Sequence, residues 1–139
     1  MIKKFLMTTL CLTAILTAGI ISVSAGTVDG TSWQTAEYVN VPPNGGTKYN
    51  TSQGSKKITT SKTASAKASY GAIFTAYGRF ITSGRADRSG AFGLTSNVYH
   101  PTLYSTADKG DTLYTKVSSN SLDPGYIEIT LKFSADHID

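Results

Sequence analysis

Apolar and polar residues alternate most regularly near the C-terminus. From residue 126 to 135 every second position is apolar, which groups Ile127, Ile129, Leu131, Phe133 and Ala135 on one face. Residues 112–118 alternate in the same way and group Leu113, Thr115 and Val117. A period of two is typical of a β-strand with one buried face. Because the turn signal Asp123-Pro124-Gly125 separates the two segments, we predict that they form a β-hairpin.

A longer alternating segment covers residues 57–77. Every even position from Ala64 to Ala76 is apolar, whereas Lys57 and Lys67 fall on the opposite, mainly polar side. The serine and β-branched residues of this segment favour a strand over a helix. Since strands are usually five or six residues long, we expect either one long bent strand or two strands that meet near Gly71.

Shorter segments complete the pattern. Residues 33–41 alternate and end at 42–46, where prolines, asparagine and glycines form a turn signal. After the long segment we expect the end of a strand at 79–82 and a charged hairpin loop at 83–90. A return strand is expected at 91–99, followed by the strand breaker Pro101 and a loop at 102–110. Residues 26–32 are expected to fray. These elements predict an all-β fold, a small antiparallel β-sandwich or partly open barrel of about six to eight strands after an N-terminal signal helix.

The first 25 residues have the character of an export leader. Lys3 and Lys4 precede a mainly apolar stretch, and Val23-Ser24-Ala25 offers small residues for cleavage after Ala25. We therefore expect a signal peptide at 1–25 and a single β domain at 26–139, in a secreted protein of bacterial type. The alternative is a membrane anchor, although the apolar stretch is at the lower limit of the length that spans a bilayer.

Composition narrows the possible chemistry. The single cysteine, Cys11, lies in the expected leader. The mature domain would then have no disulfide, cysteine-bound metal or thiol nucleophile. His100 and His137 are the only histidines, and the chain has no Gly-x-Ser-x-Gly motif. We therefore expect a non-enzymatic protein with no cofactor and no metal site.

Charge is distributed unevenly along the chain. Basic residues concentrate between positions 48 and 88, and acidic residues predominate after position 100. The candidate site is a basic binding face with aromatic support, made of Lys57, Lys67, Arg79, Arg85, Arg88, Tyr114 and Tyr126. A wider aromatic set could stack on sugar rings, although core or sheet-face packing explains most of its members more simply: Trp33, Tyr70, Tyr77, Tyr99, Tyr104, Tyr114 and Tyr126. The alternative is a solvated strand face whose lysines protect a sheet edge from aggregation.

Such a basic face suits an anionic cell-wall polymer, a glycan or a membrane surface. The export leader and the lack of a recognition motif argue against nucleic acid. We therefore expect a secreted binding protein that acts at a cell surface or envelope.

Two other functions remain open from the sequence. The first is an exported bacteriocin-like or pore-forming protein, since residues 57–76 are similar in style to segments that form membrane hairpins. A cysteine-free mature chain behind a leader also resembles bacteriocins of the lactococcin 972 type, in leader, size class and composition, and no site residue follows from that resemblance. The second is a small wall hydrolase, for which Glu37, Glu128 and His100 are the available acid and base groups.

Overall fold

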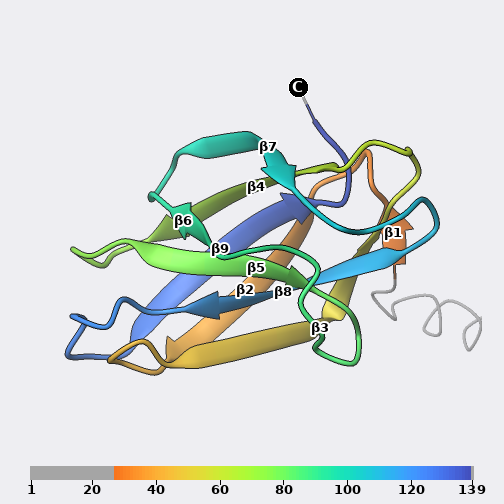
Figure 1. Ribbon diagram of the computed structural model, residues 1–139. Coiled ribbons are helices and arrows are strands. Elements are labelled where there is room, and N and C mark those ends of the chain that lie inside the picture. The colour runs from red at the N-terminus through yellow and green to blue at the C-terminus, as the bar shows by residue number, and fades with distance from the viewer. Residues whose placement is uncertain (1–26, 139) are drawn as a thin grey trace, which may run out of the picture.

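The computed structural model describes residues 27–138, which form two β-sheets packed face to face (Figure 1). Neighbouring strands of the five-stranded sheet are β1 (Thr27–Asp29), β3 (Thr47–Lys56), β8 (Thr112–Ser118), β5 (Ala76–Ile81) and β6 (Phe92–Leu94). Those of the four-stranded sheet are β2 (Gln34–Val41), β9 (Ile127–Ser134), β4 (Thr63–Tyr70) and β7 (Tyr99–Tyr104). The sheets do not close into a barrel, so the predicted all-β sandwich is confirmed. The expected signal peptide, 1–25, lies outside the described residues.

The strand number exceeds the six to eight expected, because the described residues form nine strands. Two of them, β1 and β6, have only three residues each, too few to produce a recognisable period. β1 was expected to be frayed chain, yet it pairs in parallel with β3. All other strand pairs are antiparallel.

The predicted hairpin between 112–118 and 126–135 is wrong. Both segments form strands at the expected positions, but β8 pairs with β3 and β5, whereas β9 pairs with β2 and β4. The connection therefore crosses from one sheet to the other. The apolar faces of β8 and β9 line the same core from opposite sides, and a period of two looks the same for paired strands and for facing strands.

The long segment 57–77 contains two strands rather than one. β4 ends at Tyr70 and β5 begins at Ala76, so the segment is divided near Gly71. This confirms the second of the two predicted alternatives, two strands instead of one long bent strand. The two strands belong to different sheets. Pro101 was expected to break a strand, but it lies within β7. This is tolerated because β7 is at the edge of its sheet and Pro101 lies where the register with β4 shifts, between His100 and Leu103.

The core fills the space between the sheets and is built from the predicted apolar faces. Its larger members are Tyr38, Phe80, Leu94, Leu113, Val117, Ile129, Leu131 and Phe133, with alanines of β2 and β4 between them. The small alanines let the sheets approach closely. A buried hydrogen bond crosses this core, between the Tyr38 hydroxyl and Thr115 Oγ1 at 2.6 Å. Burial raises the pKa of the Tyr38 hydroxyl well above its usual value, so it stays protonated.

Candidate functional site

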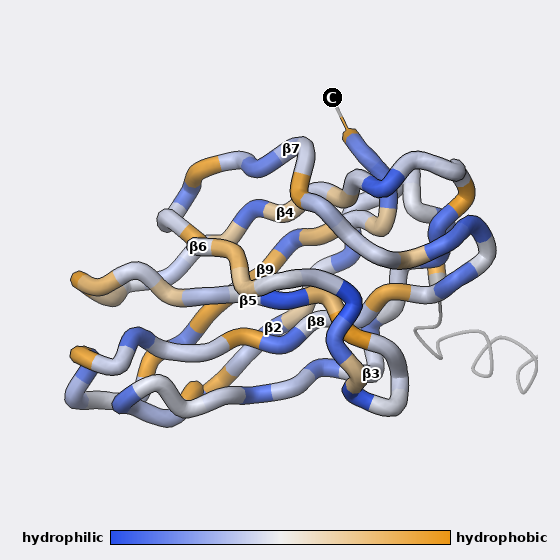
Figure 2. The backbone as a smooth tube through the Cα atoms, in the orientation of Figure 1, coloured by the Kyte–Doolittle hydropathy of each residue, from blue (hydrophilic) through white to orange (hydrophobic). Residues whose placement is uncertain are grey.

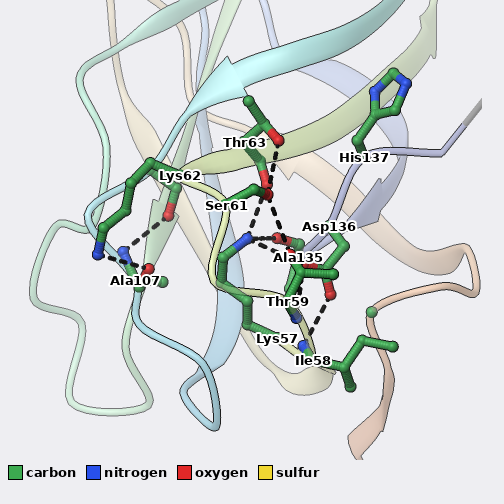
Figure 3. Close-up of polar contacts among 12 residues, drawn as sticks. Lys57, Ile58, Thr59, Ser61, Lys62, Thr63, Ala107, Ala135, Asp136 and His137 are labelled. Atoms are coloured by element: carbon green, nitrogen blue, oxygen red, sulfur yellow. Dashed lines mark hydrogen bonds and ion pairs between the residues drawn. The ribbon is translucent and has the colours of Figure 1, made fainter.

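Lys57 was expected on an exposed basic face, and this prediction is wrong. Its side chain is 0% exposed and forms an ion pair with Asp136, Nζ to Oδ1, at 3.1 Å (Figure 3). The same ammonium donates to the carbonyl oxygens of Thr63 at 2.9 Å and Ala135 at 2.8 Å. All three of its protons thus have acceptors inside the protein. Lys57 therefore joins the C-terminal segment to the loop between β3 and β4 and is not available to a ligand.

Asp136 completes this buried pair from the other side. Its Oδ2 accepts the backbone N–H of Ile58 at 2.8 Å, and its Oδ1 accepts the hydroxyl of Thr59 (Figure 3). Burial raises the pKa of the Asp136 carboxyl, but these hydrogen bonds and the Lys57 ammonium together lower it by more. The net pKa therefore lies below its usual value. The carboxylate is therefore charged at neutral pH and fully engaged in structure.

The remaining predicted site residues do not lie on one face. Lys67 is exposed on β4, on the outer face of the four-stranded sheet. Arg79 and Arg85 belong to β5 and the loop after it, on the five-stranded sheet. Arg88 and Tyr114 line a separate hollow with residues of that loop. Tyr126 is exposed in the loop between β8 and β9. The single basic face of the sequence prediction is thus divided between opposite sides of the sandwich.

On the five-stranded sheet several cations have partners within the protein. Asp87 pairs with Lys116 Nζ at 2.7 Å and with Arg79 Nη1 at 2.5 Å. Hydrogen bonding from Lys116, and then from Arg79, holds the pKa of the Asp87 carboxyl below its usual value. The guanidinium of Arg85 lies over the ring of Tyr49, 4.8 Å from its centroid, as a cation–π pair. Lys116 and Arg79 thus share one carboxylate, and the Arg85 guanidinium is held over an aromatic ring.

The four-stranded sheet carries a different arrangement on its outer face. Lys67 on β4 is directly opposite Lys132 on β9, and Tyr99 on β7 is directly opposite Lys67. The indole of Trp33, just before β2, meets the Tyr99 ring edge-on at 5.7 Å between centroids. These four residues line an open cleft of about 380 Å³, which we call the lysine cleft.

The two cations of the lysine cleft are uncompensated. Within residues 27–138, neither Lys67 nor Lys132 takes part in an ion pair or a side-chain hydrogen bond. A second hollow of about 190 Å³ adjoins the cleft and is lined by both lysines together with Ala68, Ser69, Asn97 and Thr130. The buried hydroxyl of Tyr99 also lacks a hydrogen-bond partner in the described part of the chain.

Sequence reasoning found part of this cleft. Lys67 was among the candidate site residues, and Trp33 and Tyr99 were among the aromatic candidates. Lys132 was missed as a ligand group, although its outward position in the alternating segment 126–135 was visible in the sequence. What the sequence does not contain is the register that places Lys132 beside Lys67.

The groups considered for catalysis line neither the lysine cleft nor the adjoining hollow. Glu37 on β2 accepts a hydrogen bond from Thr130 Oγ1 at 2.8 Å, and Glu128 is exposed on β9. His100 lies on β7, where its Nε2 is buried without a partner among the described residues. No group of three His, Cys, Asp or Glu in residues 27–138 could hold a metal ion. The same residues contain no helix long and apolar enough to cross a membrane.

Comparisons with protein-family models, with curated proteins and with solved structures find no match to this chain. The chemistry of the described residues is therefore the basis for a proposed function.

Proposed function

We propose that the chain is an exported, non-enzymatic binding protein that holds an anionic glycan or cell-wall polymer in the lysine cleft. The observation that carries this proposal is the pair Lys67 and Lys132, side by side and uncompensated. Two adjacent ammonium groups repel one another, and an anion between them removes that repulsion. Ligand carboxylates or phosphates therefore gain more here than at an isolated surface lysine.

The aromatic walls favour a saccharide as the carrier of that charge. Trp33 is 36% exposed and, with Tyr99, forms an apolar side to the cleft. A sugar ring has an apolar face of C–H groups and a polar rim, so it can pack on an indole while its substituents reach the lysines. Ser69, Asn97 and Thr130 line the adjoining hollow and supply neutral hydrogen-bonding groups along the same track.

The shape of the site suits a segment of a longer polymer. At about 380 Å³ the lysine cleft is near the lower limit of small-molecule pockets, and it is open to solvent. The second hollow continues from it past both lysines. A polymer can occupy such a continuous track with several units, so that weak contacts at each unit add up.

The proposal is tested with the double variant Lys67→Glu, Lys132→Glu. Binding to isolated cell walls and to soluble polygalacturonate is measured by co-sedimentation and by titration calorimetry, each at low and high salt. We expect salt-sensitive binding by the parent chain and its loss in the double variant. A matched control, Lys56→Glu with Lys109→Glu, makes the same charge change at two other exposed lysines.

The outcome is read from the comparison of the two double variants. Retained binding by the Lys56 and Lys109 control places the ligand at the cleft. Equal loss in both double variants would mean that only net charge matters, and no loss in either would remove the cleft from consideration. Trp33→Ala separates the two parts of the mechanism, because it should weaken polygalacturonate binding without changing its salt dependence.

A further inference from the structure

The loops of the sandwich gather at its two ends, and one end is almost free of charge (Figure 1). We call it the uncharged end and define it by the loops β2–β3, β4–β5, β6–β7 and β8–β9, which are residues 42–46, 71–75, 95–98 and 119–126. The only charged residue in these loops is Asp123. It is buried, and its Oδ2 accepts the backbone N–H of Asn120 at 3.1 Å. No carboxylate or ammonium from these four loops is therefore exposed.

The opposite end has the reverse character. Its loops and the segment after β9 carry Lys57, Lys62, Arg85, Asp87, Arg88, Asp108, Lys109, Asp111 and Asp136. A protein surface that faces only water gains solubility from charge on all sides. The segregation of charge between the two ends therefore calls for a physical explanation.

The uncharged end also presents large apolar side chains to solvent. Ile73, in the loop β4–β5, is 95% exposed, and Leu122, in the loop β8–β9, is 67% exposed. Tyr126 in the latter loop is 69% exposed. Figure 2 shows the tips of these two loops as apolar points that project at the same end of the molecule. An isoleucine with almost no contact to its own protein contributes nothing to the core.

Hydrogen bonds between loops hold these tips in place. The Asn120 side-chain amide donates to the carbonyl of Thr75 at 3.2 Å, which joins the loops β8–β9 and β4–β5. Backbone N–H groups of Asn44 and Gly45 donate to the carbonyls of Asp123 and Asn120. The apolar tips are therefore fixed to a common base and cannot withdraw independently into the core.

We propose that the uncharged end docks on a lipid bilayer and inserts Ile73 and Leu122 below the head groups. Inserted surface must be free of charge, because an ion in hydrocarbon costs several kilocalories per mole, and these loops meet that requirement. Tyrosine is enriched at the level of the head groups, which suits Tyr126 beside the tips. Separate projecting tips fit a fluid layer, which closes around each of them, better than they fit a rigid protein surface.

A fluorescent label reports insertion directly. Cys11 is replaced by serine, and a cysteine is introduced in the full chain either by Ile73→Cys or, as a control at the charged end, by Lys109→Cys. Each is labelled with the environment-sensitive dye NBD and mixed with phosphatidylcholine vesicles. We expect the emission from position 73 to shift to shorter wavelength and to rise severalfold, while that from position 109 stays at its aqueous value.

Affinity for the same vesicles gives a second readout that needs no label. Ile73→Ser with Leu122→Ser should lower it about tenfold or more for each tip removed. Tyr104→Ser removes an exposed aromatic residue at the far end of β7 and should leave the affinity for the vesicles unchanged. Any contribution from residues 1–26 is the same in all variants. Neutral vesicles contain no anionic polymer, so this experiment is independent of the lysine cleft.

Three results would overturn the proposal. The first is aqueous emission from position 73 in the presence of vesicles, and the second is an equal shift at positions 73 and 109. The third is concentration-dependent self-association without lipid that Ile73→Ser with Leu122→Ser abolishes, because the uncharged end would then bind a second copy of the chain.

Discussion

At the scale of single residues, the buried pair of Lys57 and Asp136 determines how the C-terminal segment is held. Its two partners are far apart in sequence, and every polar contact of the ammonium is to the protein. The desolvation of two charges is costly and is offset only when each finds several partners, as here. The pair therefore joins the end of β9 to the loop after β3. It is a structural element, and it removes one cation of the basic segment 48–88 from the surface.

Removing both partners of this pair should destabilise the protein less than the sum of the two single removals. We expect Lys57→Met to lower the free energy of unfolding by about 3 kcal/mol, because it leaves the buried Asp136 carboxylate without its counter-ion. Asp136→Asn should act in the same direction. The double variant should lose less than the sum of the two, measured by urea unfolding. Strictly additive losses would show that the two charges are not coupled.

At the scale of elements, a β-bulge in β2 changes which of its residues face the core. The register between β2 and β9 shifts between Tyr38 and Val41, and Asn40 has a φ of 55°. This bulge turns Val41 into the core, although strict alternation would place it on the same outer side as Glu37 and Val39. Asparagine is among the few residues with a side chain that adopt this left-handed conformation readily.

Substitution of Asn40 tests whether its conformation maintains the bulge. Asn40→Val should lower the free energy of unfolding by about 1 to 2 kcal/mol, because a β-branched side chain clashes at positive φ. Asn40→Gly should be nearly neutral, since glycine accepts this φ without strain. Both are measured by thermal and urea unfolding. Equal losses in the two variants would assign the effect to the lost asparagine side chain instead of to the backbone.

At the scale of the whole molecule, the charges are sorted by surface. On the five-stranded sheet Arg79 and Lys116 share the Asp87 carboxylate, in the lysine cleft the two cations have no acidic partner among residues 27–138, and the loops of the uncharged end contain no cation. The acidic residues with clearly shifted pKa values, Asp87, Asp108 and Asp136, are all shifted downwards by cationic or hydrogen-bonding partners. Each of them binds a proton more weakly in the folded than in the unfolded state.

This direction fixes how the stability of the domain depends on pH. A carboxyl group with a lowered folded pKa stabilises the fold above its unfolded pKa of about 3.9, and this contribution is lost as the pH falls through the folded pKa. We therefore expect the melting temperature to decrease when the pH is lowered below about 4. Asp136→Asn should make that fall shallower, whereas Asp108→Asn, at an exposed position, should change it little. Calorimetry between pH 2 and 7 gives the comparison, and an unchanged profile in Asp136→Asn would contradict it.

The sequence by itself determined the strand content and the side that most strands turn to the core. The apolar series in residues 112–118 and 126–135 face the core as predicted, and the charged loop 83–90 connects a hairpin of β5 and β6. These features follow from a local period and from the chemistry of turn residues, which any short stretch of chain carries within itself.

Only the tertiary structure decided which strands pair and which charges remain available. The separation of β8 from β9, the burial of Lys57 and the meeting of Lys67 with Lys132 depend on residues tens of positions apart. The alternating pattern shows which side of a strand faces the core. The pattern is the same whether another strand is its hydrogen-bonded neighbour or lies across the core. For the same reason the sequence supplied the cations and aromatic residues of the candidate site, whereas the register and packing of the sheets selected which of them share one cleft.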